Sequence, residues 1–281
     1  MEPDCIEAAQ SERLETTTEH TPHNRRRVLP FRKISNFRDL GGYPARNGRR
    51  VKWGVLYRSG HLNRATKADQ RALRDLGVST LIDFRSDRER EREPDQLPAG
   101  HQIEVISIPI QHKGQAPLSA EIRTLIKDRA LNGLDPSQKM AEMYTLLASE
   151  YTTAYREFFN TLLDADGKPI LWHCSAGKDR AGFAAALLLK ILGVGDDVII
   201  KDYLLSQTYV QRRRRQLLTV SLLRGLEAGR FIRGMNNVEL DWLQTAFKTI
   251  ERDWGCFDLY TSEALGLGPQ EQAQLKDIYL S

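Results

Sequence analysis

A chain of 281 residues, 41% of them hydrophobic, is long enough to bury a sizeable core in one large domain or two small ones. Its net charge of +4, from 41 basic and 37 acidic residues, is too small to indicate a nucleic-acid partner and is compatible with an anionic substrate. Three widely spaced cysteines argue against a disulfide framework and against a CxxC metal site. The N-terminus has no signal-peptide pattern, and the apolar runs are too short for a membrane span. Together these features favour a cytoplasmic protein.

Residues 1–30 are polar, rich first in Thr and Glu and then in Arg. This composition buries too little apolar surface to offset the entropy that is lost on ordering. We therefore expect a disordered tail over residues 1–30 and one folded domain over residues 31–281.

Strand-like and helix-like segments alternate after the tail. A β-prone run covers Val51–Ser59, and a helix is predicted to follow Thr66, its N-cap, and to end at Gly77. Further strands are expected at residues 78–85, 103–110 and 168–174. Strands that alternate with helices predict an α/β domain with a central, mostly parallel sheet covered on both faces.

Two longer segments complete the pattern. Residues 111–138 combine Gly, Pro and polar residues with one helical patch, and an insertion of this length is typically a lid or a binding loop. From residue 196 to residue 280 the apolar spacing is helical almost throughout. We therefore expect a helical lid insertion and a helical C-terminal part.

The stretch HCSAGKDRAG, His173–Gly182, separates the last predicted strand from a long apolar helix. A loop that runs from a strand into a helix directs several backbone N–H groups toward one point, which makes an anion site. The helix N-terminus and the nearby basic residues favour the thiolate form of Cys174, which is the nucleophilic form. Gly177 permits the backbone twist that such a loop requires.

Arg180 follows the cysteine at a spacing that lets its guanidinium return across a tetrahedral anion and bind two oxygens in a fork. These groups suit cleavage of a phosphate ester through a cysteinyl-phosphate intermediate, with no need for a metal or cofactor. His173 is expected to orient the loop by hydrogen bonding, and a purely structural buried histidine is the alternative. The candidate phosphate cradle consists of Ser175, Ala176, Gly177, Lys178, Asp179 and Arg180.

The pattern HCxxGxxR resembles the signature loop of cysteine-based protein tyrosine phosphatases, and HCSAGKDRAG is similar to the HCxxGKDRTG form of the bacterial PtpB-like tyrosine/phosphoinositide phosphatases. Five further stretches resemble landmarks of that family in the same order: NFRDLGGY (36–43), LYRSGHL (56–62), LIDFRSDRERE (81–91), DYLLSQ (202–207) and ERDWGCFDLYTSEALGLG (251–268). The resemblance implies a sheet of four or five strands flanked by helices, with helical insertions over the site.

The resemblance also implies a metal-independent catalytic domain that hydrolyses phosphotyrosine in a protein, with phosphoserine and phosphothreonine as additional substrates. Two alternatives stay open. One is a phosphoinositide phosphatase with the same mechanism, which the lysine of the GKDR form favours. The other is a phosphate-binding module with weak catalysis.

The family implies a general acid as well. Most tyrosine phosphatases carry it on a separate loop with a Trp-Pro-Asp sequence, which this chain lacks, and the GKDR form assigns it to the loop aspartate, here Asp179. Lys178 and Arg180 beside Asp179 favour the charged carboxylate, which conflicts with an acid that must be protonated. Asp83 and Asp87 are the alternative acids, and a strand-end cap or an ion pair is the competing interpretation of both.

Several basic residues have two interpretations. In the family the lysine equivalent to Lys178 is associated with phosphoinositide headgroups, and the alternative is a surface lysine at a helix start. Arg58 and Arg85 lie at predicted carboxyl ends of strands and either line the pocket, together with Asp83, or pair with neighbouring acids. The four arginines within Gln211–Gln216 belong to a solvated segment or make a peripheral contact with an anionic membrane.

Ala181 departs from the family pattern, which has Thr or Ser after the arginine, where the hydroxyl assists hydrolysis of the phosphoenzyme. We therefore predict a slow second step, visible as a burst of the first product in the wild type. Ala181→Thr should raise the steady-state rate. An unchanged or lower rate in this variant, or wild-type kinetics without a burst, would refute the prediction.

Overall fold

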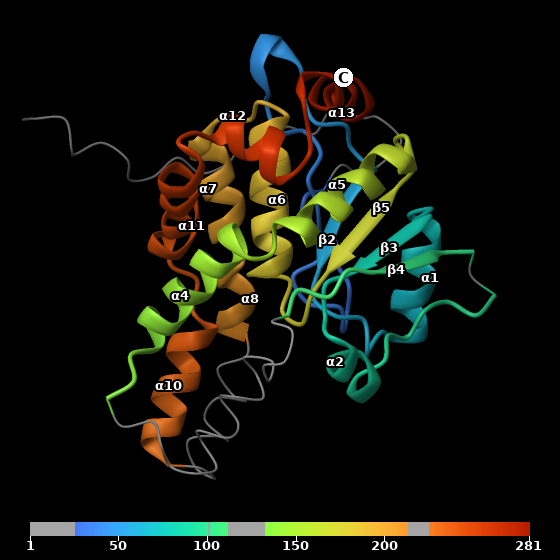
Figure 1. The fold of residues 1–281 in the computed structure, drawn as a ribbon. Coiled ribbons are helices and arrows are strands. Elements are labelled where there is room, and N and C mark those ends of the chain that lie inside the picture. The colour runs from blue at the N-terminus through green and yellow to red at the C-terminus, as the bar shows by residue number, and fades with distance from the viewer. Residues whose placement is uncertain (1–25, 101, 112–132, 213–224) are drawn as a thin grey trace, which may run out of the picture.

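A five-stranded sheet forms the centre of the computed structural model, which describes residues 26–100, 102–111, 133–212 and 225–281 (Figure 1). The strand order is β1-β2-β5-β3-β4, with β1 antiparallel to β2 and the other pairs parallel. The predicted mostly parallel sheet is thus confirmed. The strands are β1 (Arg38–Asp39), β2 (Leu56–Ser59), β3 (Thr80–Asp83), β4 (Glu104–Ser107) and β5 (Ile170–His173).

Successive residues of the central strands point into two different hydrophobic cores, as the period of a strand requires. Tyr57 and Leu81 belong to a smaller core, to which α1 contributes. Leu56, Ile82 and Trp172 point to the opposite face and join the main core, which α5 and α6 share. The sheet is therefore covered on both faces, as the alternating segments predicted.

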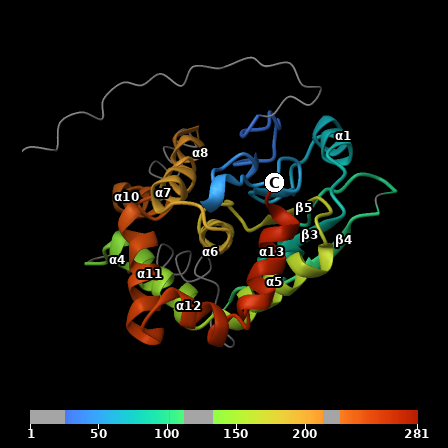
Figure 2. The ribbon, with the colours of Figure 1, turned by 90° about the horizontal axis from the view of Figure 1, so that it is seen from above.

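Helices of the C-terminal half form a separate layer beside the sheet. Figure 2 shows α6 between the strands and the layer that contains α4, α7, α10 and α11. The helices are α1 (Lys67–Asp75), α2 (Asp87–Arg92), α4 (Pro136–Ser149), α5 (Thr152–Ala165), α6 (Arg180–Ile191), α7 (Asp196–Leu204), α8 (Gln207–Arg212), α10 (Leu226–Asn236), α11 (Leu240–Trp254), α12 (Phe257–Leu259) and α13 (Pro269–Tyr279), with a 3-10 turn η1 (Arg46–Gly48) and a π-helical turn η2 (Tyr260–Ala264).

The central helix α6 is apolar on every side. From Phe183 to Leu189 each residue is at most 2% exposed, because the sheet lies on one side of the helix and other helices lie on the other. A helix that is hydrophobic all round is stable only when it is buried all round. Since α6 begins at Arg180, its N-terminus faces the carboxyl ends of the parallel strands, where α/β proteins bind ligands.

Several sequence expectations can be compared directly with this fold. Thr66 is the N-cap of α1, where its hydroxyl accepts the Asp69 N–H at 3.1 Å, and the helical C-terminal part is confirmed. Most of the predicted lid insertion, residues 112–132, lies outside the described residues, as do residues 1–25 of the predicted tail. No helix in the described ranges is long and apolar enough to span a bilayer.

Residues just before the expected domain start at residue 31 make contacts with the β1 segment. Val28 forms a β-bridge with Arg38, and the Arg27 guanidinium donates to the carbonyls of Asp39 at 3.0 Å and Gly41 at 2.8 Å. The same guanidinium lies 3.5 Å from the centre of the Tyr43 ring. Composition alone does not predict these contacts, because they join Arg27 and Val28 to residues ten or more positions further along the chain.

Candidate active site

The loop that follows β5 carries the predicted nucleophile. Cys174 comes directly after the strand and is 2% exposed, whereas Ser175 and Ala176 are partly exposed. The chain then enters α6 at Arg180. The strand–loop–helix context that the sequence predicted is confirmed. Cys174 is less exposed than Ser175 and Ala176, the two residues that follow it.

Gly177 brings the loop backbone against the end of β2. Its φ is +68°, and a Cβ added there would lie 2.4 Å from the carbonyl carbon and oxygen of Ser59. The position therefore requires glycine for two reasons, the left-handed backbone and the absence of a side chain. The His61 N–H donates to the Ser175 carbonyl at 3.3 Å and adds a second link between the loop and the β2 segment.

Arg58 and Asn36 hold the loop from its buried side. Nη2 of Arg58 donates to the Gly177 carbonyl at 2.7 Å, and Nδ2 of Asn36 donates to the same oxygen at 2.8 Å. The two side chains belong to residues that are 0% and 1% exposed. Both donors hold the Gly177 carbonyl oxygen toward the interior of the protein. An anion can therefore bind on the opposite side of the loop without facing this oxygen.

Asp202 on α7 balances the charge of this buried region. Its carboxylate accepts hydrogen bonds from Arg38 at 3.0 Å and from both Arg58 and Tyr43 at 2.9 Å. Burial alone would raise the pKa of Asp202, but the two guanidinium groups outweigh burial and hold it below its usual range. Burial, followed by Arg38, lowers the pKa of Arg58 to about 10, so Arg58 stays charged at neutral pH.

Glu89 on α2 fixes the orientation of Arg180. Nη1 and Nη2 of Arg180 donate to the two oxygens of Glu89 at 2.9 and 3.1 Å, in the fork geometry of an Arg–carboxylate pair. The Ser175 hydroxyl donates to the same carboxylate at 2.7 Å. Burial would raise the pKa of Glu89, but hydrogen bonding to Arg180 and the charge of Arg180 hold it well below its usual range.

His173 lies in a buried charged cluster below the loop. Its Nδ1 is 3.2 Å from the Cys174 carbonyl, and its Nε2 is 3.2 Å from a carboxylate oxygen of Asp95. Arg85 pairs with Asp83 at 2.7 Å and with Asp95 at 2.6 Å. Burial lowers the pKa of His173, but Asp83 and Asp95 together outweigh burial and raise it. The raised pKa favours the protonated form of His173, which together with Arg85 would balance the two carboxylates.

The same cluster has the spacing of a metal site but not its chemistry. Donor atoms of Asp83, Asp95 and His173 all lie within 4.8 Å of one another. The guanidinium of Arg85 is bonded to both carboxylates and therefore takes the place of a cation. The residues fit an internal ion-pair network better than a metal centre.

Arg58, Asp83 and Arg85 do not line an open pocket. They are 0%, 2% and 2% exposed, and their charges are used in the buried pairs described above. In this structure Arg58 pairs with Asp202 and Arg85 pairs with Asp83 and Asp95, as the second interpretation of the two arginines expects. Asp83 is bound to Arg85 and is not available as an acid, while Asp87 pairs with Arg90 on the surface of α2.

Lys178 is not a surface lysine, because it is only 4% exposed. Its ammonium donates to the carbonyls of Met235 at 3.1 Å and Asn237 at 2.8 Å, and to Asp179 at 2.9 Å. It also lies 5.0 Å from the centre of the Trp242 ring. All three ammonium protons are therefore used within the protein, which leaves none for a second phosphate in this arrangement.

Asp179 lies at the N-cap of α6, and its side chain is 18% exposed. Its Oδ1 accepts hydrogen bonds from Lys178 at 2.9 Å and from the hydroxyl of Tyr144 at 3.0 Å. Among the described residues Asp179 is the loop acid that combines access to solvent with attachment to the buried interior. This combination is what a proton donor at the mouth of a site needs.

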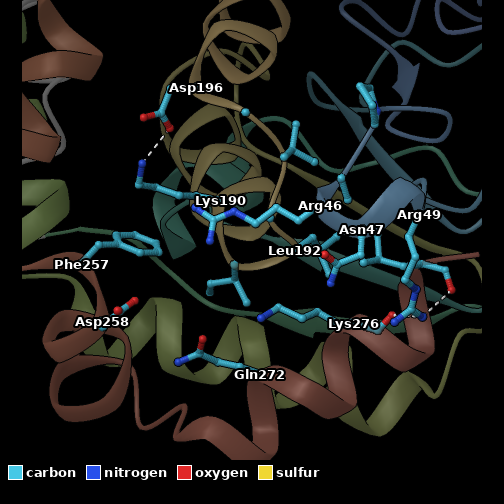
Figure 3. Close-up of a pocket in the computed structure, with 17 residues that line it drawn as sticks. Arg46, Asn47, Arg49, Lys190, Leu192, Asp196, Phe257, Asp258, Gln272 and Lys276 are labelled. Carbon is cyan, nitrogen blue, oxygen red and sulfur yellow. Dashed lines mark hydrogen bonds and ion pairs between the residues drawn. The ribbon is translucent and has the colours of Figure 1, made fainter.

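A cavity of about 780 Å³ lies at the other end of α6, where the helix finishes (Figure 3). Basic side chains from three elements line it, namely Arg46, Lys190 and Lys276. Lys190 is already paired with Asp196 at 2.6 Å. None of the predicted site residues lines this cavity, so it is separate from the candidate active site.

Sequence reasoning missed several supporting residues, among them Glu89, Asp202 and Tyr144. Glu89 stands three residues after Ser86 in a capping-box pattern, which marks a helix start but not its contact with Arg180. Asp202 lies in a stretch that resembles the family, and no local signal ties it to two arginines. Tyr144 is one apolar-face residue of α4 among several and carries no signal at all.

The close approach at Gly177 can be separated from its backbone conformation by a matched pair of variants. Gly48 also has a positive φ, +74°, but an added Cβ there meets nothing within 4 Å. Gly48→Ala should cost about 1–2 kcal/mol of unfolding free energy, the cost of left-handed backbone alone. Gly177→Ala should lower the unfolding free energy by about 1–3 kcal/mol more than Gly48→Ala does, because the added methyl group overlaps the backbone of Ser59. Equal losses in urea unfolding would contradict the packing of the loop.

The charge on His173 predicts a specific pH dependence of stability. A raised pKa means that its contribution to stability is complete below about pH 6.5 and is lost as pH rises through the pKa of the folded state. The gap in unfolding free energy between wild type and His173→Gln should therefore shrink as pH rises above 6.5. The comparison by urea unfolding cancels groups that titrate in both proteins. A gap that stays constant or widens would show that His173 is neutral in the folded state.

Comparison with known proteins agrees with this geometry. A tyrosine phosphatase family profile matches residues 29–281. A Cupriavidus necator protein that carries the name of a tyrosine-protein phosphatase is 35% identical over 259 residues, which cover 91% of this chain and 89% of the relative. The triple specificity protein phosphatase PtpB of Mycobacterium tuberculosis is 30% identical over 257 residues, covering 82% and 91%.

Among solved structures, TpbA of P. aeruginosa in complex with phosphotyrosine overlaps only weakly, with 18% identity and a TM-score of 0.28 over 55% of this chain and 70% of that one. The family assignment therefore depends on the sequence matches, which span nearly the whole folded part of the chain. The chain belongs to the tyrosine phosphatase family and is, like the family, a phosphoric monoester hydrolase.

Proposed function

We propose that this enzyme hydrolyses phosphotyrosine in proteins through a cysteinyl-phosphate at Cys174. The observation that supports the proposal most is the arginine of the loop. Glu89 holds the Arg180 guanidinium in a fork beside Ser175, before any ligand is bound. A preorganised guanidinium next to a cysteine loop is suited to the charge that develops on a transferring phosphoryl group.

The reaction proceeds in two displacements. The Cys174 thiolate attacks phosphorus, an S–P bond forms, and the bond from phosphorus to the tyrosyl oxygen breaks. The electron pair of the broken bond stays on that oxygen, which takes a proton from Asp179. Water then attacks phosphorus and gives a proton to the Asp179 carboxylate. The S–P bond breaks, and phosphate leaves with the Cys174 thiolate and the neutral Asp179 restored.

Each loop residue has a role in this proposal. Arg180 and the backbone of residues 175–180 bind the phosphoryl oxygens, and Asp179 is the general acid. His173 orients the loop through the contact of its Nδ1 with the Cys174 carbonyl. Arg58, Asp83 and Arg85 support the loop or its surroundings and do not touch the substrate.

Phosphotyrosine is favoured over a phosphoinositide for two reasons. The similar proteins are named tyrosine-protein phosphatase and triple specificity protein phosphatase. The cation that suggested a headgroup site, Lys178, is buried and uses its protons inside the protein. Phosphoserine and phosphothreonine stay within the proposal as additional protein substrates. Of the four arginines, Arg213, Arg214 and Arg215 lie outside the described residues, and membrane contact stays a prediction.

Phosphate release in the presence of EDTA tests the proposal. The substrates are a phosphotyrosine peptide, the same peptide with phosphoserine, and phosphoinositide vesicles. We expect fastest release from the phosphotyrosine peptide and a loss of at least about 10³-fold in Cys174→Ser, because the nucleophile is removed.

Cys256→Ser is the matched control, since Cys256 is exposed and lies on the separate helix start of α12, and its activity should equal that of the wild type. Faster release from the vesicles would move the substrate to phosphoinositides. Activity that survives in Cys174→Ser would contradict the mechanism.

A further inference from the structure

Two tyrosines from outside the loop form a hydrogen-bonded chain that ends on Asp179. The hydroxyl of Tyr144 donates to Oδ1 of Asp179 at 3.0 Å, and the hydroxyl oxygens of Tyr144 and Tyr203 are 2.8 Å apart. A phenolic hydroxyl has one proton to donate. Because Tyr144 gives its proton to Asp179, Tyr203 must be the donor to Tyr144.

The chain is rigid and dry. Tyr144 and Tyr203 are 0% and 1% exposed. Their rings meet edge to face with centres 6.2 Å apart, and the Tyr144 ring also packs at 6.3 Å from that of Trp242. Burial, followed by the charge of Asp179, raises the pKa of Tyr144 well above its usual value, so the hydroxyl stays a donor throughout the working range.

The two oxygens of Asp179 are therefore not equivalent. Oδ1 accepts from Tyr144 at 3.0 Å and from Lys178 at 2.9 Å. In the described part of the chain no hydrogen bond involves Oδ2. The carbonyl-like oxygen of a neutral carboxyl can accept both donors, whereas an O–H at the same position would clash with them. The proton of a neutral Asp179 belongs on Oδ2.

We propose that Tyr144, with Tyr203 behind it, is a positioning residue that keeps Oδ1 of Asp179 turned inward and Oδ2 free to deliver the proton. The inference depends on the proposed function, in which Asp179 is the general acid. In the first displacement the Oδ2–H bond breaks and its proton goes to the leaving oxygen. The negative charge that develops on Asp179 is then stabilised at Oδ1 by Tyr144 and Lys178.

Tyr144 and Lys178 contribute differently to the surroundings of Asp179. Lys178 favours a charged Asp179, yet its ammonium also donates to two backbone carbonyls, that of Met235 in the last turn of α10 and that of Asn237 just after the helix. Tyr144 adds a neutral donor, which orients the carboxyl without adding further positive charge. Orientation of the acid can thus be separated experimentally from the charge around it.

The test compares how kcat/KM depends on the leaving group of the substrate. A residue with only a structural role would not change this dependence. Phenyl phosphate needs a proton on its leaving oxygen, whereas dinitrophenyl phosphate leaves well without one. We compare kcat/KM for both substrates, because this constant covers steps up to formation of the phosphoenzyme and is insensitive to a slow second displacement. Tyr144→Phe keeps the ring and its packing, and thermal unfolding checks that the variant is folded.

We expect Tyr144→Phe to lower kcat/KM on phenyl phosphate by about 10-fold or more and on dinitrophenyl phosphate by less than about 3-fold, since part of the gain from general acid catalysis is lost. Tyr203→Phe is the graded comparison within the same chain. It leaves the bond from Tyr144 to Asp179 in place and removes only the donor behind it, so its loss on phenyl phosphate should be smaller, below about 3-fold. Equal losses on both substrates in Tyr144→Phe, or no loss on either, would overturn the inference.

Asp179→Asn separates the inference from the proposed function on which it depends. This variant should lower kcat/KM by at least about 100-fold on phenyl phosphate and by much less on dinitrophenyl phosphate, relative to the wild type. Without such a difference Asp179 is not the acid, and the proposed mechanism fails first. With the difference present in Asp179→Asn but absent in Tyr144→Phe, only the role of Tyr144 is refuted.

Discussion

The carboxylate of Asp202, buried between Arg38 and Arg58, is the interaction on which the rest of the site depends. It joins β1, β2 and α7, and Arg58 extends the connection by 2.7 Å to the Gly177 carbonyl of the loop. Removing one member of such a group leaves an uncompensated charge in the interior and typically costs about 3–5 kcal/mol. The buried group of Asp202, Arg38 and Arg58 thus sets the position of the loop that contains Cys174.

The sheet and the added helices supply different parts of the chemistry. The sheet side provides Cys174 at the end of β5 and, through α2, Glu89 for the Arg180 guanidinium. The helical side surrounds Asp179 with Tyr144 from α4 and Tyr203 from α7, and it ties down Lys178 at the α10–α11 connection. In the proposed mechanism the acid is Asp179, inside the loop, and these helices orient it, so the mechanism requires no separate acid loop.

The sequence was sufficient wherever a single stretch carries its own signal. Alternation of strand and helix patterns predicted the sheet, Thr66 marked the start of α1, and the strand–loop–helix context of Cys174 was readable from the residues around it. The parallel order of the strands follows from the long connections between them.

Contacts between distant stretches could not be read in this way. Arg58 and Arg85 carry the same local signal whether they face a pocket or an internal acid, and only the placement of Asp202 and Asp95 decides between these outcomes. The contacts of Arg27 with the Tyr43 ring and with the Asp39 carbonyl of β1 could not be predicted for the same reason. Tyr144 reaches Asp179 from 35 residues away, through the packing of helices that composition alone does not arrange.

The measurement that tests the central claim most directly is the location of the phosphoryl group on the enzyme during turnover. Wild-type enzyme is mixed with excess phenyl phosphate, quenched within the first turnovers, digested and analysed by peptide mass spectrometry. The account predicts one phosphoryl group on the sulfur of Cys174. A phosphoryl group on another side chain, or substrate turnover without any covalent intermediate on Cys174, would contradict it.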